Sequence, residues 1–229
     1  MLAKLKLVKT PKGIDSILML SAILIIWIGN YSNLDLMLAD RMFDSARGLF
    51  SARQDTLAGG FHFAMTGLAA ALILLALWDA WRPLAWPASR RTALRVTALA
   101  ALLVPASIYL LSSLSGTPCP GDLLRYGGSA SYARLLETAS SNTAAMACLP
   151  ATQASTAWWL LALPLFFLPR RPHLAMLAAG VTLLCGLAVG WQQQMQGTQF
   201  FSHTLWSAWI AAFLIYLLYG MCKADDALA

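Results

Sequence analysis

Residues able to carry out acid–base or phosphate chemistry gather in three polar segments of an otherwise apolar chain. The segments are residues 112–128 (SSLSGTPCPGDLLRYGG), 148–155 (CLPATQAS) and 190–207 (GWQQQMQGTQFFSHTLWS). The imidazole of His203 could act as a nucleophile or carry a proton, and the guanidinium of Arg125 could hold phosphate oxygens. Because the segments are far apart in the chain, these residues form a site only if the fold brings the segments together.

The other polar residues of these segments are mainly glutamines. A glutamine amide donates and accepts hydrogen bonds, but it exchanges no proton near neutral pH and does not attack a phosphoryl group. Two interpretations are open. The amides satisfy one another in a polar cavity, or they bind a lipid headgroup without cleaving it, because polar groups at a membrane edge are costly to leave unpaired. The residues concerned are Gln153, Gln192, Gln193, Gln194, Gln196 and Gln199.

The three segments resemble, in order, the three motifs of the type 2 phosphatidic acid phosphatase superfamily. The similarity is greatest to a bacterial branch with Cys-Pro-Trp-Asp-Leu, Arg-Tyr-Gly-Gly, Pro-Ala-Gly-His-Ala-Ser and Gly-Ala-His-Phe-Leu-Ser-His stretches, and it covers nearly the whole chain. The resemblance implies an all-α, six-span bundle with its site at the outer membrane surface, where members typically remove phosphate from lipids through a phosphohistidine. That reaction needs a histidine nucleophile oriented by a carboxylate, a second histidine as acid, and Lys and Arg side chains that hold phosphate.

In the first two motifs, other side chains occupy the positions of the cations and the acid. Ser112 takes the position of the family's lysine, and Cys119, followed by Pro120, takes that of its arginine. In the second motif Gln153 replaces the acid histidine, while Ser155 is retained. The resemblance therefore implies a site without its usual phosphate clamp in the first motif and without its acid in the second.

The third motif lacks the family's nucleophile. Gln193 takes the arginine position, Gln199 that of the nucleophilic histidine, and His203 that of the aspartate. Histidine at this last position also belongs to the bacterial branch, so it is the smallest departure. Since each such loss typically removes several kcal/mol of transition-state stabilisation, the usual reaction should not run.

Two residues could rescue a reaction. His203 could substitute as the nucleophile with Arg125 as the phosphate clamp, although a hydrogen-bonded structural histidine is favoured. Arg125 could equally be an ion-pair partner of Asp122 or Glu137, and His62 is expected to be structural. The candidate ligand-binding residues are Asp122, Arg125, Tyr126, Gln153, Ser155, Gln193, Gln199 and His203, with no metal ligands and no cofactor.

The cysteines fall into two pairs. Cys119 and Cys148 lie in the long polar segment, whereas Cys185 and Cys222 lie in or at the end of apolar runs. In an oxidising compartment the first pair could form a disulfide. It would close a loop of about 30 residues. By lowering the entropy of the unfolded chain, it would stabilise the folded state by roughly 3 to 4 kcal/mol. The alternative, two thiols held too far apart to bond, stays open, and the spacing fits neither a zinc site nor a redox dithiol motif.

The composition is that of a membrane protein. Of 229 residues, 59% are hydrophobic and 11% charged, and the mean hydropathy is +0.64, whereas a soluble domain carries about 25% charged residues. Too little polar surface remains to cover a globule in water, so a single membrane domain over residues 1–229 is expected. Spans of roughly 20 residues each are predicted at Ile14–Ile28, Ala58–Trp78, Ala93–Leu114, Gln153 or Trp158 to Leu168, Leu174–Gly190 and His203–Met221.

Three segments are expected outside these six spans, on the outer side. Residues 33–50 mix apolar and charged side chains at three- and four-residue spacing, which predicts an amphipathic helix at the interface or, alternatively, a solvated connector. Residues 115–155 and 191–202 are predicted outer loops. Eleven Lys and Arg fall in inner loops and termini and five outside, which places both termini in the cytoplasm. The same distribution argues against nucleic-acid binding despite a net charge of +6.

These observations favour a multi-pass protein of a bacterial inner (plasma) membrane with its site facing the periplasm. The leading hypothesis is a catalytically degenerate lipid-phosphatase-like protein, not an enzyme, that takes part in envelope-lipid modification. It would bind a membrane lipid (phospholipid, undecaprenyl phosphate or lipid A class) or a partner inner-membrane protein. The alternatives are an active lipid phosphate or pyrophosphate phosphatase that uses His203 and Arg125, and a structural subunit of a membrane complex.

Overall fold

The computed structural model describes residues 13–51, 56–115, 117–134, 137, 148–150 and 155–226. Apart from one short hairpin, these residues form an all-α fold of seven α-helices joined by turns and short 3₁₀ helices. Five of the helices are long and apolar enough to cross a membrane. These are α1 (Ile14–Tyr31), α3 (Thr56–Trp81), α4 (Ala88–Ser115), α6 (Pro172–Met195) and α7 (Phe201–Asp226).

The predicted fourth span is the exception. It consists of α5 (Ser155–Trp158, four residues) and the 3₁₀ helix η3 (Trp159–Phe167, nine residues), which contains Pro164. Together these two pieces reach about 24 Å, less than the roughly 30 Å of hydrocarbon in a bilayer. The predicted fourth span is thus present as a shorter apolar helix packed inside the bundle, and residues 151–154 just before it lie outside the described part of the chain.

The long helices continue past the apolar runs from which they are predicted. At the end of α1 the side chains of Asn30 and Ser32 donate to backbone carbonyls one turn earlier, which satisfies groups that lipid could not. At the other end of the chain, α6 runs on to Met195 through three glutamines. The predicted outer loop 191–202 is therefore too long, and the connection between α6 and α7 is only residues 196–200.

Residues 33–50 form a short helix followed by a hairpin, not the single amphipathic helix that is predicted. The helix α2 (Leu34–Met42) ends where β1 (Phe43–Asp44) pairs antiparallel with β2 (Leu49–Phe50). The reason is local: the Asp44 carboxylate accepts hydrogen bonds from the next backbone N–H groups of the turn, which competes with continued helix.

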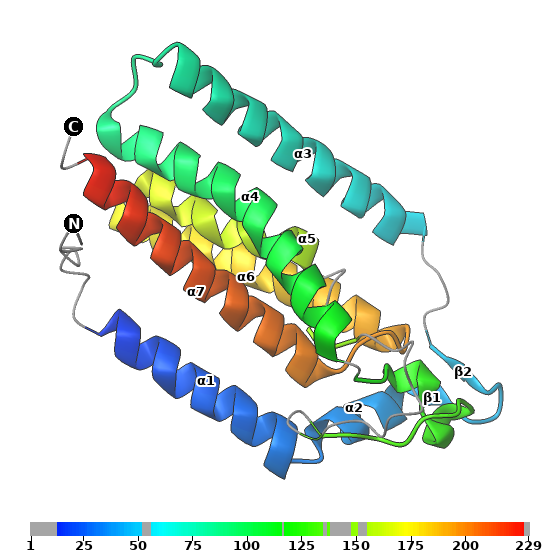
Figure 1. The fold of residues 1–229 in the computed structure, drawn as a ribbon. Coiled ribbons are helices and arrows are strands. Elements are labelled where there is room, and N and C mark those ends of the chain that lie inside the picture. Colours follow the sequence, from blue (N-terminus) through cyan, green and yellow to red (C-terminus); the bar gives the residue numbers. More distant parts are fainter. Residues whose placement is uncertain are drawn as a thin grey trace.

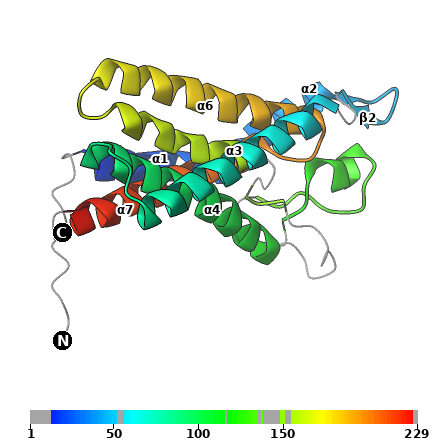
Figure 2. The same cartoon turned by 90° about the horizontal axis from the view of Figure 1, so that it is seen from above.

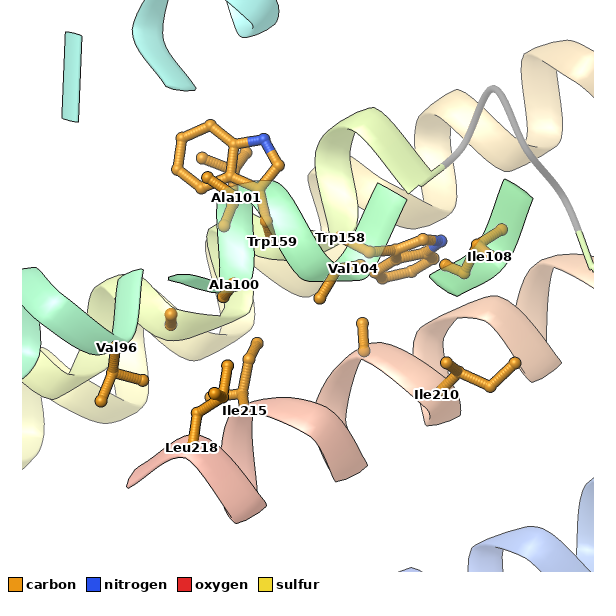
Figure 3. Close-up of a cluster of buried hydrophobic side chains, with 13 residues drawn as sticks. Val96, Ala100, Ala101, Val104, Ile108, Trp158, Trp159, Ile210, Ile215 and Leu218 are labelled. Carbon is orange, nitrogen blue, oxygen red and sulfur yellow. The ribbon is translucent and has the colours of Figure 1, made fainter. Parts of the chain in front are cut away.

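The core of the bundle lies where α4, α5, η3 and α7 meet. Figure 3 shows their buried side chains gathered around Trp158 and Trp159. Figures 1 and 2 place α3 on one flank and α1 on the opposite flank, with α3 packed mainly on α4 and α1 mainly on α7. The outside of the bundle carries large exposed apolar side chains, as a surface in contact with lipid requires. They include Ile17, Leu20, Phe63, Leu77, Leu110, Met176 and Leu184.

The bundle has two different ends. One end, where α1 begins and α7 finishes, also carries the connection from α3 to α4, and we call it the termini end (Figure 1). There the hydroxyl of Tyr216 on α7 donates to Asp15 on α1. The opposite end holds α2, the hairpin and residues 117–134, which include the 3₁₀ turns η1 (Pro120–Asp122) and η2 (Leu124–Tyr126). We call it the disulfide end.

Candidate functional site

The disulfide end brings the three polar segments together. Cys119 and Cys148 are joined in a disulfide, the pairing that the sequence predicts, with Cα atoms 5.3 Å apart. The backbone N–H of Cys148 donates to the carbonyl of Thr117 at 3.0 Å, and that of Gly121 donates to the carbonyl of Gly197 at 2.8 Å. The first segment is thus bonded to both the second and the third.

Two glycines permit this close packing. Gly197 has a φ of +70°, and a side chain there would collide with the Phe50 ring of the hairpin. A Cβ at Gly128 would overlap the backbone of Asp122, because the chain turns back there to bond to the Asp122 carbonyl. The segment 117–130 is therefore a compact cap that lies directly on the hairpin and on the connection before α7.

His203 is buried in the first turn of α7 and is held by the disulfide segment. Its side chain is 3% exposed, and Nδ1 lies 3.0 Å from the carbonyl oxygen of Cys148 and 3.4 Å from Oε1 of Gln199. The Phe200 ring contacts the imidazole edge to face. Because a carbonyl oxygen only accepts hydrogen bonds, Nδ1 carries the proton in this contact, and in the neutral ring Nε2 holds the lone pair.

The glutamines of the third segment are buried, and not all of their atoms find partners. Gln193, Gln194 and Gln199 are at most 4% exposed. The backbone carbonyl of Gln193 accepts both the N–H and the hydroxyl of Thr198. Within the described part of the chain, however, Oε1 of Gln193 and both amide atoms of Gln194 have no hydrogen-bond partner. Among the described residues, no other amide pairs with that of Gln194, and Gln153 of the same predicted group lies outside them.

The carboxylate of Asp35 belongs to the site, although it is not among the residues predicted from the sequence. Asp35 lies on α2, is 4% exposed, and accepts hydrogen bonds from the Ser202 backbone N–H at 2.9 Å and from the Ser202 hydroxyl. It thereby occupies the N-terminus of α7, where free N–H groups and the helix dipole favour an anion. Burial raises the pKa of the Asp35 carboxyl, against the lowering effect of the hydrogen bonds from Ser202. In the sequence, Asp35 is one of several charges in residues 33–50, and nothing there indicates a partner in α7.

The structure corrects the partner of Arg125. The sequence suggests Asp122 or Glu137, but the guanidinium binds both carboxylate oxygens of Asp40 on α2, at 2.7 and 2.8 Å, and the hydroxyl of Tyr126 donates to the same carboxylate at 2.9 Å. The hydrogen bond from Arg125 lowers the pKa of the Asp40 carboxyl and raises that of the guanidinium, while burial raises the pKa of Tyr126. Arg125 is therefore engaged with a carboxylate at the surface of the cap.

The remaining predicted residues divide by position. Ser112 at the end of α4 and Ser155 at the start of α5 are both buried at the disulfide end. Asp122 is half-buried in η1, where its backbone carbonyl holds the turn of the cap. Gln153 lies outside the described residues. His62 is exposed on α3. It is therefore not part of the buried cluster, the name we give to the buried polar side chains at this end: Asp35, Ser112, Ser155, Gln193, Gln194, Gln199, Ser202 and His203.

Three arginines at this end are bound to protein groups, whereas Arg41 on α2 is exposed. Besides Arg125, Arg47 pairs with Asp44 at 3.5 Å and Arg134 donates to the backbone carbonyl of Asn30. Among the described residues, none of the buried polar side chains is a Lys or Arg, and no three His, Cys, Asp or Glu side chains gather as metal ligands would. The cluster can donate and accept hydrogen bonds and take up a proton at one imidazole nitrogen, but it offers no buried cation to a phosphate.

Comparison of the chain with models of protein families, with curated proteins and with solved structures finds no match. The resemblance to the type 2 phosphatidic acid phosphatase superfamily consequently rests on the three motif-like segments alone. The structure adds that the described parts of these segments lie together at one end of a membrane bundle.

Proposed function

We propose that the protein is a catalytically degenerate member of the type 2 phosphatidic acid phosphatase superfamily, which binds a membrane lipid without removing its phosphate. The observation that carries the proposal is the composition of the buried cluster at the disulfide end. Its motif-like segments are joined as a family site would require, but amides stand at the positions of the nucleophile and of one clamp residue.

The contacts of the charged groups also support a loss of phosphate chemistry. A phosphoryl-transfer site stabilises developing negative charge with fixed cations or helix N-termini. Here the N-terminus of α7 already holds the Asp35 carboxylate, and Arg125 already holds that of Asp40. A phosphate group would have to displace a carboxylate from either place before it gained any stabilisation.

The distribution of charge and the disulfide support the proposed location in the cell. Five long apolar helices make a multi-pass membrane protein. Eleven Lys and Arg fall on the side assigned to the termini and five on the other, and a disulfide persists only in an oxidising compartment. These observations support a bacterial inner membrane, with the termini end in the cytoplasm and the disulfide end in the periplasm, where the bound lipid would take part in envelope-lipid modification.

The test is an activity assay combined with lipid identification. Protein purified in mild detergent is incubated with phosphatidic acid, undecaprenyl pyrophosphate and lipid A, and phosphate release is compared with a protein-free control, while native mass spectrometry identifies the lipids that stay bound. We expect retained lipid and no release above the control. Robust release that is abolished by His203→Asn, which keeps a donor near the Cys148 carbonyl, would overturn the proposal.

A second candidate, an active phosphatase with a rewired site, is favoured by one observation. The Cys148 carbonyl fixes the proton of His203 on Nδ1 and leaves Nε2 as the nucleophilic nitrogen. In that case Arg125 would have to release Asp40 in order to hold the phosphate. Mass spectrometry of protein quenched during incubation with substrate decides the matter: a phosphohistidine at His203 supports this candidate, and its absence under conditions of substrate binding counts against it.

A further inference from the structure

Gln194 lies on the face of α6 that points into the bundle, toward the start of α7. A Cβ at Gly186 would collide with the Trp158 ring, and a Cβ at Gly190 would collide with Thr204 of α7. Positions four residues apart share a helix face, so Gln194 continues this inward stripe one turn beyond Gly190. That turn is the last of α6, next to the connection that leads into α7.

The burial of this side chain has no explanation within the described residues. Gln194 is 1% exposed, and neither its amide nitrogen nor its amide oxygen has a hydrogen-bond partner in the described part of the chain. Buried polar groups in folded proteins are nearly always paired, since an unpaired one costs the folded state its full desolvation penalty. An apolar residue of the same shape would be more stable here, so the amide needs a partner that the described residues do not supply.

The chemistry around Gln194 restricts what that partner is. A primary amide is neutral and is both donor and acceptor, and its best partner is a group with the same property, such as a hydroxyl. The fixed charge at the start of α7 is the Asp35 carboxylate, so a second anion beside it is disfavoured. No Lys or Arg is found among the buried described side chains to offset such an anion.

We propose that the Gln194 amide binds a hydroxyl group of an uncharged polyol, such as the glycerol or sugar part of a headgroup, while the phosphate of the lipid stays outside the cluster. The inference deepens the proposed function and rests on it, because it assumes that a lipid reaches the disulfide end. A free polyol offers the same hydroxyl, so the experiment must separate the two sources.

The first measurement is the thermal unfolding of delipidated protein with Gln194→Met, whose unbranched side chain has nearly the shape of glutamine. If the amide is unpaired without ligand, its removal raises the unfolding temperature by roughly 2 to 4 °C. Gln194→Leu repeats the test in case methionine does not pack. The matched control is Gln196→Met, two residues on and only half-buried, where no increase is expected.

The second measurement is lipid retention by native mass spectrometry, with phosphatidylglycerol, phosphatidic acid and phosphatidylethanolamine of matched acyl chains. Wild-type protein should retain phosphatidylglycerol about tenfold better than phosphatidic acid, a preference that one paired amide can supply. Gln194→Met should abolish the preference, and Gln196→Met should keep it. If glycerol alone raises the unfolding temperature of the wild type but not of Gln194→Met, the hydroxyl comes from a free polyol, and the site itself is supported.

Two results would overturn the inference and leave the proposed function intact. One is an unfolding temperature that falls in both Gln194 variants, which would mean that the amide is paired within the protein. The other is an unchanged lipid preference in a variant that unfolds at a higher temperature. Retention of no lipid at all by the wild type would contradict the proposed function instead.

Discussion

Asp79 and Asp35 are two buried carboxylates at opposite ends of the bundle, and they are stabilised in different ways. Asp79, at the termini end, is fully buried and accepts hydrogen bonds from Arg91 at 3.1 and 3.2 Å and from the Leu84 backbone at 2.9 Å, with Arg95 at 3.9 Å. Asp35, at the disulfide end, is bonded to the backbone and the hydroxyl of a serine. One carboxylate is neutralised by cations, and the other relies on neutral donors and the dipole of α7.

The difference shows what each end can bind. The termini end is an ionic junction, in which a carboxylate at the end of α3 fixes the arginines at the start of α4. The buried part of the disulfide end is held by a covalent bond and by neutral donors, and the anion site at the N-terminus of α7 is already filled from within the chain. A family-like arrangement of segments is therefore combined with electrostatics that do not suit phosphate.

The largest effect should follow removal of the covalent bond at the disulfide end. The bond joins residues 29 apart in sequence, so in Cys119→Ser with Cys148→Ser the loss of loop constraint should lower the free energy of unfolding by about 3 to 4 kcal/mol. Chemical denaturation of the purified protein in detergent measures the change. Cys185→Ser is the control, because Cys185 is a free thiol. An unchanged stability would mean that neutral hydrogen bonds alone hold this end.

The next largest effect should come from the ionic junction. Asp79→Asn leaves the arginines with a neutral partner, and loss of buried, charge-assisted hydrogen bonds should cost about 2 to 3 kcal/mol. Asp35→Asn, the same substitution at the other end, should cost about 1 kcal/mol or less, because an amide oxygen still accepts from the Ser202 N–H and a buried charge is removed. Thermal unfolding of both variants beside Asp44→Asn, on the exposed hairpin, checks the order. Equal losses at Asp79 and Asp35 would remove the contrast between the ends.

The sequence predicts the membrane bundle and the gathering of three segments, because both depend on features that are local or carried by motifs. Continuous apolar runs identify the long helices, and their shared place in the long polar segment singles out Cys119 and Cys148. The short fourth element could not be predicted in this way, because Trp158 to Phe167 is as apolar as a true span. Only the structure shows that its described part is short, 3₁₀ in conformation and packed inside the bundle.

The polar contacts of the site could not be predicted either, for a different reason. Asp35 and Ser202 are 167 residues apart in sequence, and Asp40 and Arg125 are 85 apart. Such pairs depend on where α2 lies over the bundle, and no residue spacing encodes that placement. Burial of Gln194 agrees with the predicted polar cavity, but no feature of the glutamine run indicates that this amide lacks a partner among the described residues.

A smaller effect is expected in the pH dependence of stability, and its direction tests the same contrast between the two ends. Burial raises the folded-state pKa of Asp35 above its unfolded value, so its contribution to stability is fully present below about pH 4. That contribution is lost as the pH rises through the folded-state pKa. On lowering the pH from 7 to about 4, the unfolded-state pKa, the wild type should gain stability relative to Asp35→Asn, since other titrating groups cancel in the difference. A wild type that loses stability relative to Asp35→Asn over this range would mean that the α7 N-terminus outweighs the burial of the charge.

The smallest effect is expected at the Asp40–Arg125 pair, which links α2 to the cap at the surface. The hydrogen bond from Arg125 lowers the pKa of Asp40, so this pair contributes above the unfolded pKa of about 4 and is lost as the pH falls through the lower folded value. Because Asp40 is 38% and Arg125 57% exposed, solvent and salt screen the interaction.

A double-mutant cycle with Asp40→Asn and Arg125→Gln, in 0.05 and 0.5 M salt, measures this coupling. We expect a shift in unfolding temperature of no more than about 2 °C, and near disappearance of the coupling in the higher salt. The Asp79–Arg91 cycle, with its buried carboxylate, should keep most of its coupling. A salt-sensitive Asp40–Arg125 pair can exchange its carboxylate for another anion, so Arg125 would then remain available to a lipid phosphate at the surface of the cap. A coupling as salt-resistant as that of Asp79 would instead tie Arg125 to α2 and remove the clamp on which an active phosphatase would depend.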